Sequence, residues 1–255
     1  MLPLYDDNPT RRLPILTIGL ILINLLVFGY QLSLPNTTQL GGEVAFQCEY
    51  GMVPAHVLKG ADPALDLDAA SGREVSCQGV NQQQGRFLGL FASQFVHGGW
   101  LHLLGNMLFL WVFGNNIEDR LGRLRFLPFY LLCGALAALS QGLWALRDVQ
   151  EAGLPVIGAS GAISGVMGAY LALFPRAGIW TLVAFVFPLK IPAWLWIGIY
   201  LVLQFFYLGS SGPGAGVAYL AHIGGLVAGW LLIRPMLAGR ADPPPPETAI
   251  PRTAF

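Results

Sequence analysis

Three short polar motifs lie within otherwise apolar stretches of this sequence. The first is HGGWLHLLGN, which contains His97, His102 and Asn106. The second is GASG, which contains Ser160, and the third is AYLAHIGGLVAG, which contains His222. Three of the four histidines of the chain therefore fall in apolar segments. Because a polar side chain is costly in such a setting, each of these residues is a candidate for function.

The residue types match nucleophilic attack on an amide. A serine is a weak nucleophile until a base takes its proton, and histidine is the side chain best suited to this near neutral pH. Ser160 and His222 are therefore the candidate nucleophile and base. The attack produces an oxyanion, which His102, Asn106 and a backbone N–H at Ser160 can stabilise by donating hydrogen bonds. The three apolar segments hold no acidic residue, so the sequence predicts a Ser–His dyad rather than a triad with Asp.

The composition describes the setting of these motifs. The 255 residues are 55% hydrophobic and only 11% charged, and the mean hydropathy is +0.58. An average soluble domain has roughly 25% charged residues, so this chain lacks the polar residues that would cover a soluble fold. It is predicted to be an all-α polytopic membrane protein. The 14 basic and 14 acidic side chains balance, which argues against nucleic-acid binding through the phosphate backbone.

Six apolar segments are predicted to cross the membrane as helices. They are residues 13–32, 97–114, 124–146, 159–174, 191–208 and 214–233. A shorter apolar stretch, 179–188, is expected to lie at the interface or to extend a neighbouring helix. The chain then divides into a cytoplasmic N-terminus (1–12), a six-helix membrane domain (13–234) with a long outer loop over 35–93, and a Pro-rich disordered tail (235–255).

Lys and Arg orient the six segments. With the N-terminus inside, ten of the 14 Lys and Arg residues are cytoplasmic, and Lys59, Arg73, Arg86 and Arg147 are outside. The positive-inside rule then places both termini in the cytoplasm. Segments two, four and six all run inwards, so their polar residues share one depth near the outer face. His222 is expected about eight residues into segment six, roughly 12 Å below its start.

Glycines flank the serine and recur along two of the segments. Gly158 and Gly161 leave room around Ser160 and allow close backbone approach. The small-residue faces are Gly161, Gly165 and Gly168 on segment four, and Gly225 and Gly229 on segment six. Faces of this kind bring membrane helices into close contact. We expect this contact to place Ser160 within reach of His222.

Two of the three cysteines lie in the long outer loop. Cys48 and Cys77 would face an oxidising compartment and are candidates for a disulfide, with two free thiols as the alternative. Cys133 lies in the third segment, where packing is its expected role.

Together the three motifs resemble those of the rhomboid intramembrane serine protease family. Each motif alone is weak, but all three occur in the family's order on the even-numbered segments. His97 matches a supporting histidine of the family, and His102 and Asn106 match its two oxyanion donors. Ser160 matches the nucleophile, and His222 matches its base. The resemblance implies a six-helix fold that cleaves transmembrane proteins near their outer ends, without metal or cofactor. The N-terminal DDNPTRR run is similar to bacterial members, which implies the bacterial inner membrane.

Two positions depart from the family's pattern. Leu88 and Gly89 stand where many members have Trp-Arg before the first histidine, so the first loop is expected to sit differently in the bilayer. Ser164 stands where some members have an aromatic residue stacked on the catalytic histidine. His222 must therefore be held in some other way.

Two other functions remain open. One is a rhomboid-like protein without proteolytic activity that binds membrane clients; loss of Ser160 or His222 would favour it, and both are present. The other is a small transporter or channel in which three histidines, His97, His102 and His222, form a proton or metal path. Transporters more often show repeated halves, and we find no such repeat in this sequence.

A segment rich in glycine and serine, Gly209–Gly216, joins segments five and six on the outer side. Hydrolysis inside a membrane requires that water and an unwound substrate strand reach the serine. We expect this segment to be a mobile cap over Ser160, and segment five to shift beside it and admit the substrate laterally. The alternative is an ordinary tight connection with no gating role.

Overall fold

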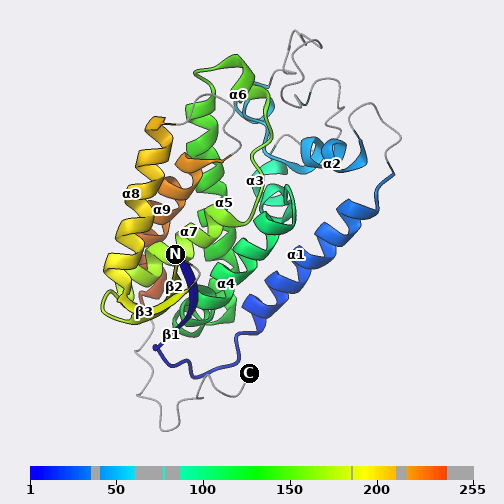
Figure 1. Ribbon diagram of the computed structural model, residues 1–255. Coiled ribbons are helices and arrows are strands. Elements are labelled where there is room, and N and C mark those ends of the chain that lie inside the picture. Colours follow the sequence, from blue (N-terminus) through cyan, green and yellow to red (C-terminus); the bar gives the residue numbers. More distant parts are fainter. Residues whose placement is uncertain (36–40, 61–76, 78–86, 185, 211–216, 240–255) are drawn as a thin grey trace.

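The computed structural model describes residues 1–35, 41–60, 77, 87–184, 186–210 and 217–239. Helices dominate the fold, and a small sheet lies near one end of the bundle (Figure 1). The long helices are α1 (Ile15–Ser33), α4 (Trp100–Leu121), α5 (Arg123–Ala145), α7 (Ser160–Leu173), α8 (Ala193–Ser210) and α9 (Tyr219–Leu237). The short ones are α2 (Gly42–Tyr50), the π-helix η1 (Ala55–Lys59), α3 (Gly89–Ala92), the 3-10 helix η2 (Ser93–Phe95) and α6 (Val149–Gly153).

Each of the six predicted segments corresponds to one long helix. Helices α1, α5, α8 and α9 are long and apolar enough to cross a membrane. Helix α4 follows the segment Gly89–Phe95 after a bend of 96°, and the two together make a further candidate span. Helix α7 is apolar but has only 14 residues. These helices confirm the prediction of a polytopic helical membrane protein.

Two predicted helix starts were wrong, and both concern histidines. His97 lies in the bend that precedes α4, which begins only at Trp100. Helix α9 begins at Tyr219 because the backbone of Ala218 is not helical (φ −83°, ψ 70°). His222 therefore lies in the first turn of its helix, not about eight residues along it.

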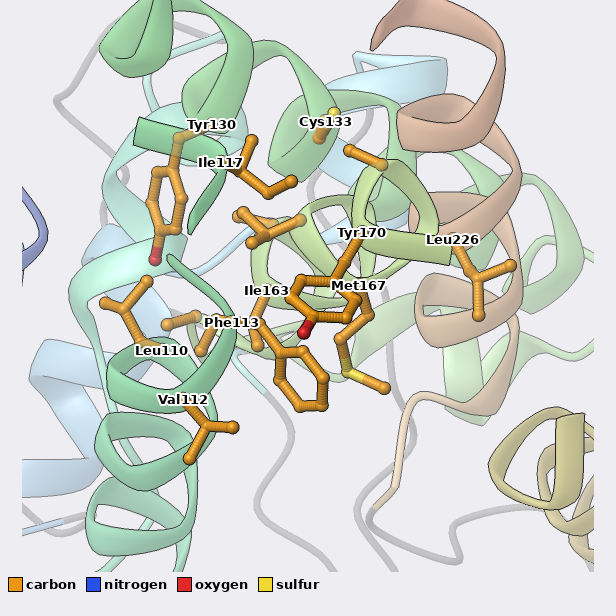
Figure 2. Close-up of a cluster of buried hydrophobic side chains, with 14 of the residues drawn as sticks. Leu110, Val112, Phe113, Ile117, Tyr130, Cys133, Ile163, Met167, Tyr170 and Leu226 are labelled. Atoms are coloured by element: carbon orange, nitrogen blue, oxygen red, sulfur yellow. The ribbon is translucent and has the colours of Figure 1, made fainter. Parts of the chain in front are cut away.

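Helix α7 occupies the centre of the molecule. All ten residues from Gly161 to Tyr170 are buried. Figure 2 shows side chains of α7, among them Ile163, Met167 and Tyr170, packed between residues of α4 and α5 and Leu226 of α9. A helix surrounded by protein needs no polar face, which explains why α7 has no charged residue and few polar ones. Its short length and its central place fix Ser160, its first residue, inside the bundle.

Helices α7 and α9 touch through their backbones. A Cβ atom placed on Gly225 would overlap the carbonyl oxygen of Gly161, and one placed on Gly229 would overlap that of Gly165. A Cβ atom on Gly168 would likewise overlap the carbonyl oxygen of Leu226. The close contact predicted from the small-residue faces is confirmed, and it brings the start of α9 against the start of α7.

A three-stranded antiparallel sheet was not predicted. Its strands are β1 (Leu2–Asp6), β2 (Gly178–Val183) and β3 (Phe187–Pro192), in the order β1-β2-β3. Of the two alternatives for residues 179–188, a position at the interface or the extension of a neighbouring helix, the second is therefore wrong. Aromatic and β-branched residues at 179–183 favour a strand, and Pro188 cannot donate a hydrogen bond within a helix. Lys190 Nζ lies 2.5 Å from Asp7 Oδ2 and ties the hairpin to the N-terminus.

At the same end of the bundle, buried polar side chains connect α4 to the N-terminal region. Glu118 of α4 accepts hydrogen bonds from the backbone N–H groups of Leu16 (3.0 Å) and Thr17 (2.7 Å). These N–H groups belong to the first turn of α1, where no helix carbonyl can accept from them. The N-cap residue, Pro14, provides no side-chain cap. Asn116 donates to Asp6 at 2.7 Å in the same region. Helix α4 thus holds the start of α1 in place.

The long loop before α4 packs against the chain that leads into α7. Met52 and Val156 exchange two backbone hydrogen bonds, both 3.0 Å long. The backbone N–H of Gly158 donates to the carbonyl of Ser93 at 2.9 Å. Within this loop Cys48 and Cys77 form a disulfide bond, and both cysteines are buried. The loop therefore supports the turn that carries Gly158 and Ser160.

Candidate active site

Ser160 and His222 meet at the starts of two helices. The Oγ atom of Ser160 lies 2.9 Å from Nε2 of His222, within hydrogen-bond distance. Ser160 is the first residue of α7, and His222 is in the first turn of α9. The glycine contact between these helices brings together two side chains that are 62 residues apart in the sequence. A hydroxyl donating to an imidazole is the arrangement that makes serine a nucleophile.

The two side chains line a cavity of about 590 Å³. Residues of α4, α5, α7, α8 and α9 form its wall, together with Glu151 of α6 and the extended segment 154–157. The polar side chains in the wall include His102, Asn106, Ser160, Ser164, Tyr200 and His222. The other lining residues are mostly apolar, among them Phe109, Ile163 and Met167. The cavity therefore offers a few polar groups beside the serine in an otherwise apolar space, as is common for substrate sites.

His102 lies directly beside the turn that precedes Ser160. A Cβ atom on Gly158 would be 2.7 Å from Cε1 and Nε2 of the His102 ring and 3.8 Å from Ser160 Oγ. The backbone N–H of Gly98 donates to Nδ1 of His102 at 3.3 Å. A neutral ring whose Nδ1 accepts this bond carries its proton on Nε2. The nitrogen next to Gly158 is thus a donor.

Asn106 is one helical turn beyond His102 and lines the same cavity. Its side-chain nitrogen donates to the carbonyl of His102 at 2.8 Å, which uses one of its two amide hydrogens. Only 7% of the residue is exposed, so the amide is held firmly. Both predicted oxyanion donors therefore lie in the cavity that contains Ser160.

His97 is placed behind His102 rather than in the cavity wall. Its ring is fully buried and meets the His102 ring edge to face, with 5.1 Å between the centroids. Gln31 of α1 holds the His97 backbone by donating to its carbonyl at 2.7 Å.

Gly161, the glycine that follows Ser160, faces Ala137 of α5, whose Cβ would be 2.6 Å from a Cβ added at Gly161.

Helix α8 brings two residues to His222 that were not among the predicted site residues. Oε1 of Gln204 lies 2.8 Å from Nδ1 of His222. The ring of Tyr200 lies beside the imidazole, with 6.1 Å between the centroids, and its hydroxyl is 3.1 Å from Ser164 Oγ. Gln204 had a signal in the sequence, since an amide in the middle of an apolar span is costly without a partner.

Two further predictions bear on the surroundings of the site. The proposed cap falls largely on residues 211–216, which lie outside the described residues, although Val217 and Ala218 beyond it line the cavity. Leu88 and Gly89, the residues at the positions where many family members have Trp-Arg, lie at the start of α3.

Within the described part of the chain, no three His, Cys, Asp or Glu side chains are arranged to hold a metal ion.

The sequence matches a known family model over this region. Residues 84–239, more than half of the chain, match the model described as the Rhomboid domain. The chain belongs to the rhomboid family. The match covers α4 to α9 and so includes every helix that lines the cavity. The family to which the three polar motifs were similar is therefore confirmed.

Several rhomboid proteins are similar to this chain over more than half of its length. It is 34% identical over 145 residues to "Rhomboid protein 1, mitochondrial" of Saccharomyces cerevisiae, covering 56% of this chain and 40% of that protein. It is 32% identical over 149 residues to "Rhomboid protease GluP" of Bacillus subtilis, covering 58% of this rhomboid chain and 25% of that protein. With "RHOMBOID-like protein 5" of Arabidopsis thaliana the identity is 32%, over 60% of this chain and 47% of that protein. The chain thus spans less than half the length of these relatives.

Proposed function

We propose that this rhomboid is an intramembrane serine endopeptidase. The observation that carries the proposal is the 2.9 Å contact between Ser160 Oγ and His222 Nε2 inside a cavity of the bundle. The name of the Bacillus subtilis relative, a rhomboid protease, supports it. Proteases of this type need no metal or cofactor, because the serine itself forms the covalent intermediate.

The geometry supports the following sequence of steps. His222 Nε2 accepts the proton of Ser160 as its Oγ attacks the substrate carbonyl carbon. The oxyanion that forms is stabilised by His102 Nε2–H, the Asn106 amide and the backbone N–H of Ser160 at the start of α7. His222 then gives its proton to the leaving amine, and a water molecule hydrolyses the acyl-enzyme. Every group in this scheme borders the same cavity.

The substrates we propose are transmembrane proteins. The cavity is lined in part by helices whose outer faces are apolar, such as α8 with exposed Val202, Phe205 and Phe206. A substrate helix hides its amides in its own hydrogen bonds, so it must unwind before Ser160 can attack. The predicted cap and lateral opening at segment five remain part of this proposal.

We further propose the orientation given by the Lys and Arg residues. Ten of the 14 lie toward the side of both termini, which would be the cytoplasm of a bacterial cell. Ser160 would then lie near the outer face of the inner membrane. The cytoplasmic N-terminus (1–12) and the membrane domain (13–234) with its outer loop follow from this orientation. The predicted tail (235–255) begins inside α9, which continues to Leu237, and residues 240–255 lie outside the described residues. A reporter fused after Phe255 should be cytoplasmic and one inserted near Asp66 should be external; an external C-terminus would contradict the arrangement.

A fluorophosphonate probe tests the chemistry. The purified protein in detergent should be labelled by the probe and should cut a model transmembrane substrate. Ser160→Ala should abolish both, and so should His222→Ala, because the two residues act as one unit. Ser140→Ala is a matched control, since this serine of α5 bonds the carbonyl of Leu136 and does not line the cavity. An intact, folded wild type that is neither labelled nor active would favour a protein that binds membrane clients without cutting them.

A further inference from the structure

His222 has a second hydrogen-bond partner, on the side away from the serine. Nδ1 of His222 lies 2.8 Å from Oε1 of Gln204, while Nε2 lies 2.9 Å from Ser160 Oγ. We propose that Gln204 and Tyr200 of α8 are positioning residues that hold His222 in the tautomer and orientation needed by a general base. This inference rests on the proposed protease function and identifies the residues that position its general base.

The tautomer follows from the two hydrogen bonds. Ser160 can pass its proton to His222 only if Nε2 carries no hydrogen of its own. A neutral imidazole then has its hydrogen on Nδ1, and this N–H must find an acceptor in a buried place. The carbonyl oxygen of Gln204 is that acceptor at 2.8 Å. With the Gln204 amide reversed, its NH₂ would donate to Nδ1, and Nε2 would be protonated and useless as a base.

Tyr200 fixes the plane of the same imidazole. Its ring lies 6.1 Å from the His222 ring, and its hydroxyl is held by Ser164 Oγ at 3.1 Å. On its other side Tyr200 stacks on Trp196, with 6.3 Å between centroids and 10° between planes. Trp196 is 1% exposed and packs against Phe113 of α4. The imidazole is thus supported by a row of aromatic rings that is anchored in the core.

The spacing of these residues places them on one face of α8. Trp196, Tyr200 and Gln204 are four residues apart, which is one helical turn at each step. The buried residues of α8 are Ala193, Trp196, Ile197 and Gln204, and Gln204 carries the one side-chain amide among them. An amide buried in an apolar span is retained at a cost unless it makes a hydrogen bond. Its bond to His222 supplies that compensation.

Gln204 borders His222 without forming part of the cavity wall. A group that acts through the histidine should change the rate of the chemical step more than the binding of substrate. We therefore expect Gln204→Met, which keeps the length of the side chain but removes the acceptor, to lower kcat about 10–100-fold with little change in KM. Gln204→Glu keeps both the length and an acceptor oxygen and should recover most of the lost turnover.

The aromatic support gives a second pair of variants. Tyr200→Phe and Ser164→Ala each remove one end of the same hydroxyl contact. Their effects on kcat should be similar, and the double variant should be no slower than the slower single variant, because the two changes break one interaction.

The matched control for Gln204→Met is Gln94→Met. Gln94 is an equally buried glutamine that bonds the carbonyls of Leu90 and Leu131 and does not line the cavity.

A spectroscopic measurement separates this inference from the protease proposal. NMR of the full chain in micelles with isotope-labelled histidine reports which ring nitrogen carries the hydrogen, and His222→Ala assigns the signal. At neutral pH, wild-type His222 should be protonated on Nδ1, and Gln204→Met should change that signal while Gln94→Met does not. Such a result in a protein that never cleaves or labels would keep the positioning role and remove the protease proposal. Wild-type His222 protonated on Nε2, or Gln204→Met with an unchanged signal and full turnover, would overturn the inference even if cleavage is real.

Discussion

Replacing Gly158 with alanine adds one methyl group at the turn that leads into Ser160. The residue has φ +111°, a backbone conformation that residues with a Cβ atom rarely adopt. The new Cβ would also lie 2.7 Å from Cε1 and Nε2 of His102, about 0.8 Å closer than ordinary contact. Ser160 Oγ, at 3.8 Å, would not be crowded. The change therefore tests the histidine and the turn without touching the nucleophile.

The two effects have different sizes and different readouts. Strain at this backbone conformation should cost about 1–3 kcal/mol of stability. For a chain of this size, each kcal/mol lowers Tm by about 2–4 °C. Displacement of His102 should remove one oxyanion donor and reduce kcat by about 10²-fold or more. We therefore expect a folded protein with a modestly lower Tm and a much lower rate of cleavage.

The assay combines thermal unfolding in detergent with cleavage of a model transmembrane substrate. Gly19→Ala serves as the control, because a Cβ on this residue of α1 meets nothing within 4 Å and its Tm and turnover should stay at or above those of the wild type. If Gly158→Ala cleaves substrate at the wild-type rate and has an unchanged Tm, then residue 158 neither requires glycine in this turn nor lies against the His102 ring, and the reasoning is refuted.

Three further predictions follow from the same contacts. Asn106→Ala should lower kcat more than it raises KM, by at most about 2.7–4 kcal/mol, as for loss of a single oxyanion donor; a change in KM alone would make Asn106 a binding residue. Gly225→Ala should separate α9 from α7, since the added methyl group overlaps the Gly161 carbonyl, and should reduce both Tm and fluorophosphonate labelling; labelling at the wild-type rate would show that the helix contact does not set the position of His222. Glu118→Ala should leave the first N–H groups of α1 without their acceptor and lower the stability by about 1–3 kcal/mol, measured by unfolding in detergent, while turnover of the folded fraction stays the same.

The membrane helices and the groups of the candidate dyad could be read from the sequence because both depend on local information. A long apolar run is costly to expose to water, so it marks a membrane helix wherever it packs. Ser160, His102, Asn106 and His222 stood out because polar side chains are rare in such runs. The glycine faces could also be recognised from the local sequence, since small residues at helical spacing permit backbone contact between helices.

Other features depended on residues that are distant in the sequence. The strand β1 pairs with β2 across more than 170 positions, and no pattern within residues 179–188 reveals that partner. The start of α9 at Tyr219, which sets the depth of His222, depends on a non-helical backbone at Ala218. The short α7 became a central helix because α4, α5 and α9 surround it.

The residues that hold His222 show most clearly which features the sequence determined and which the tertiary structure decided. The sequence by itself determined that a serine and a histidine were available. Its resemblance to the family added that Ser164 stands where some members have an aromatic residue stacked on the histidine. Tertiary structure alone decided what replaces that neighbour. The packing of α8 against α9 and α7 turns Gln204 and Tyr200 toward the imidazole. A hydrogen bond of 2.8 Å depends on the rotation and height of two helices, and neither quantity is encoded in the spacing of residues along either one.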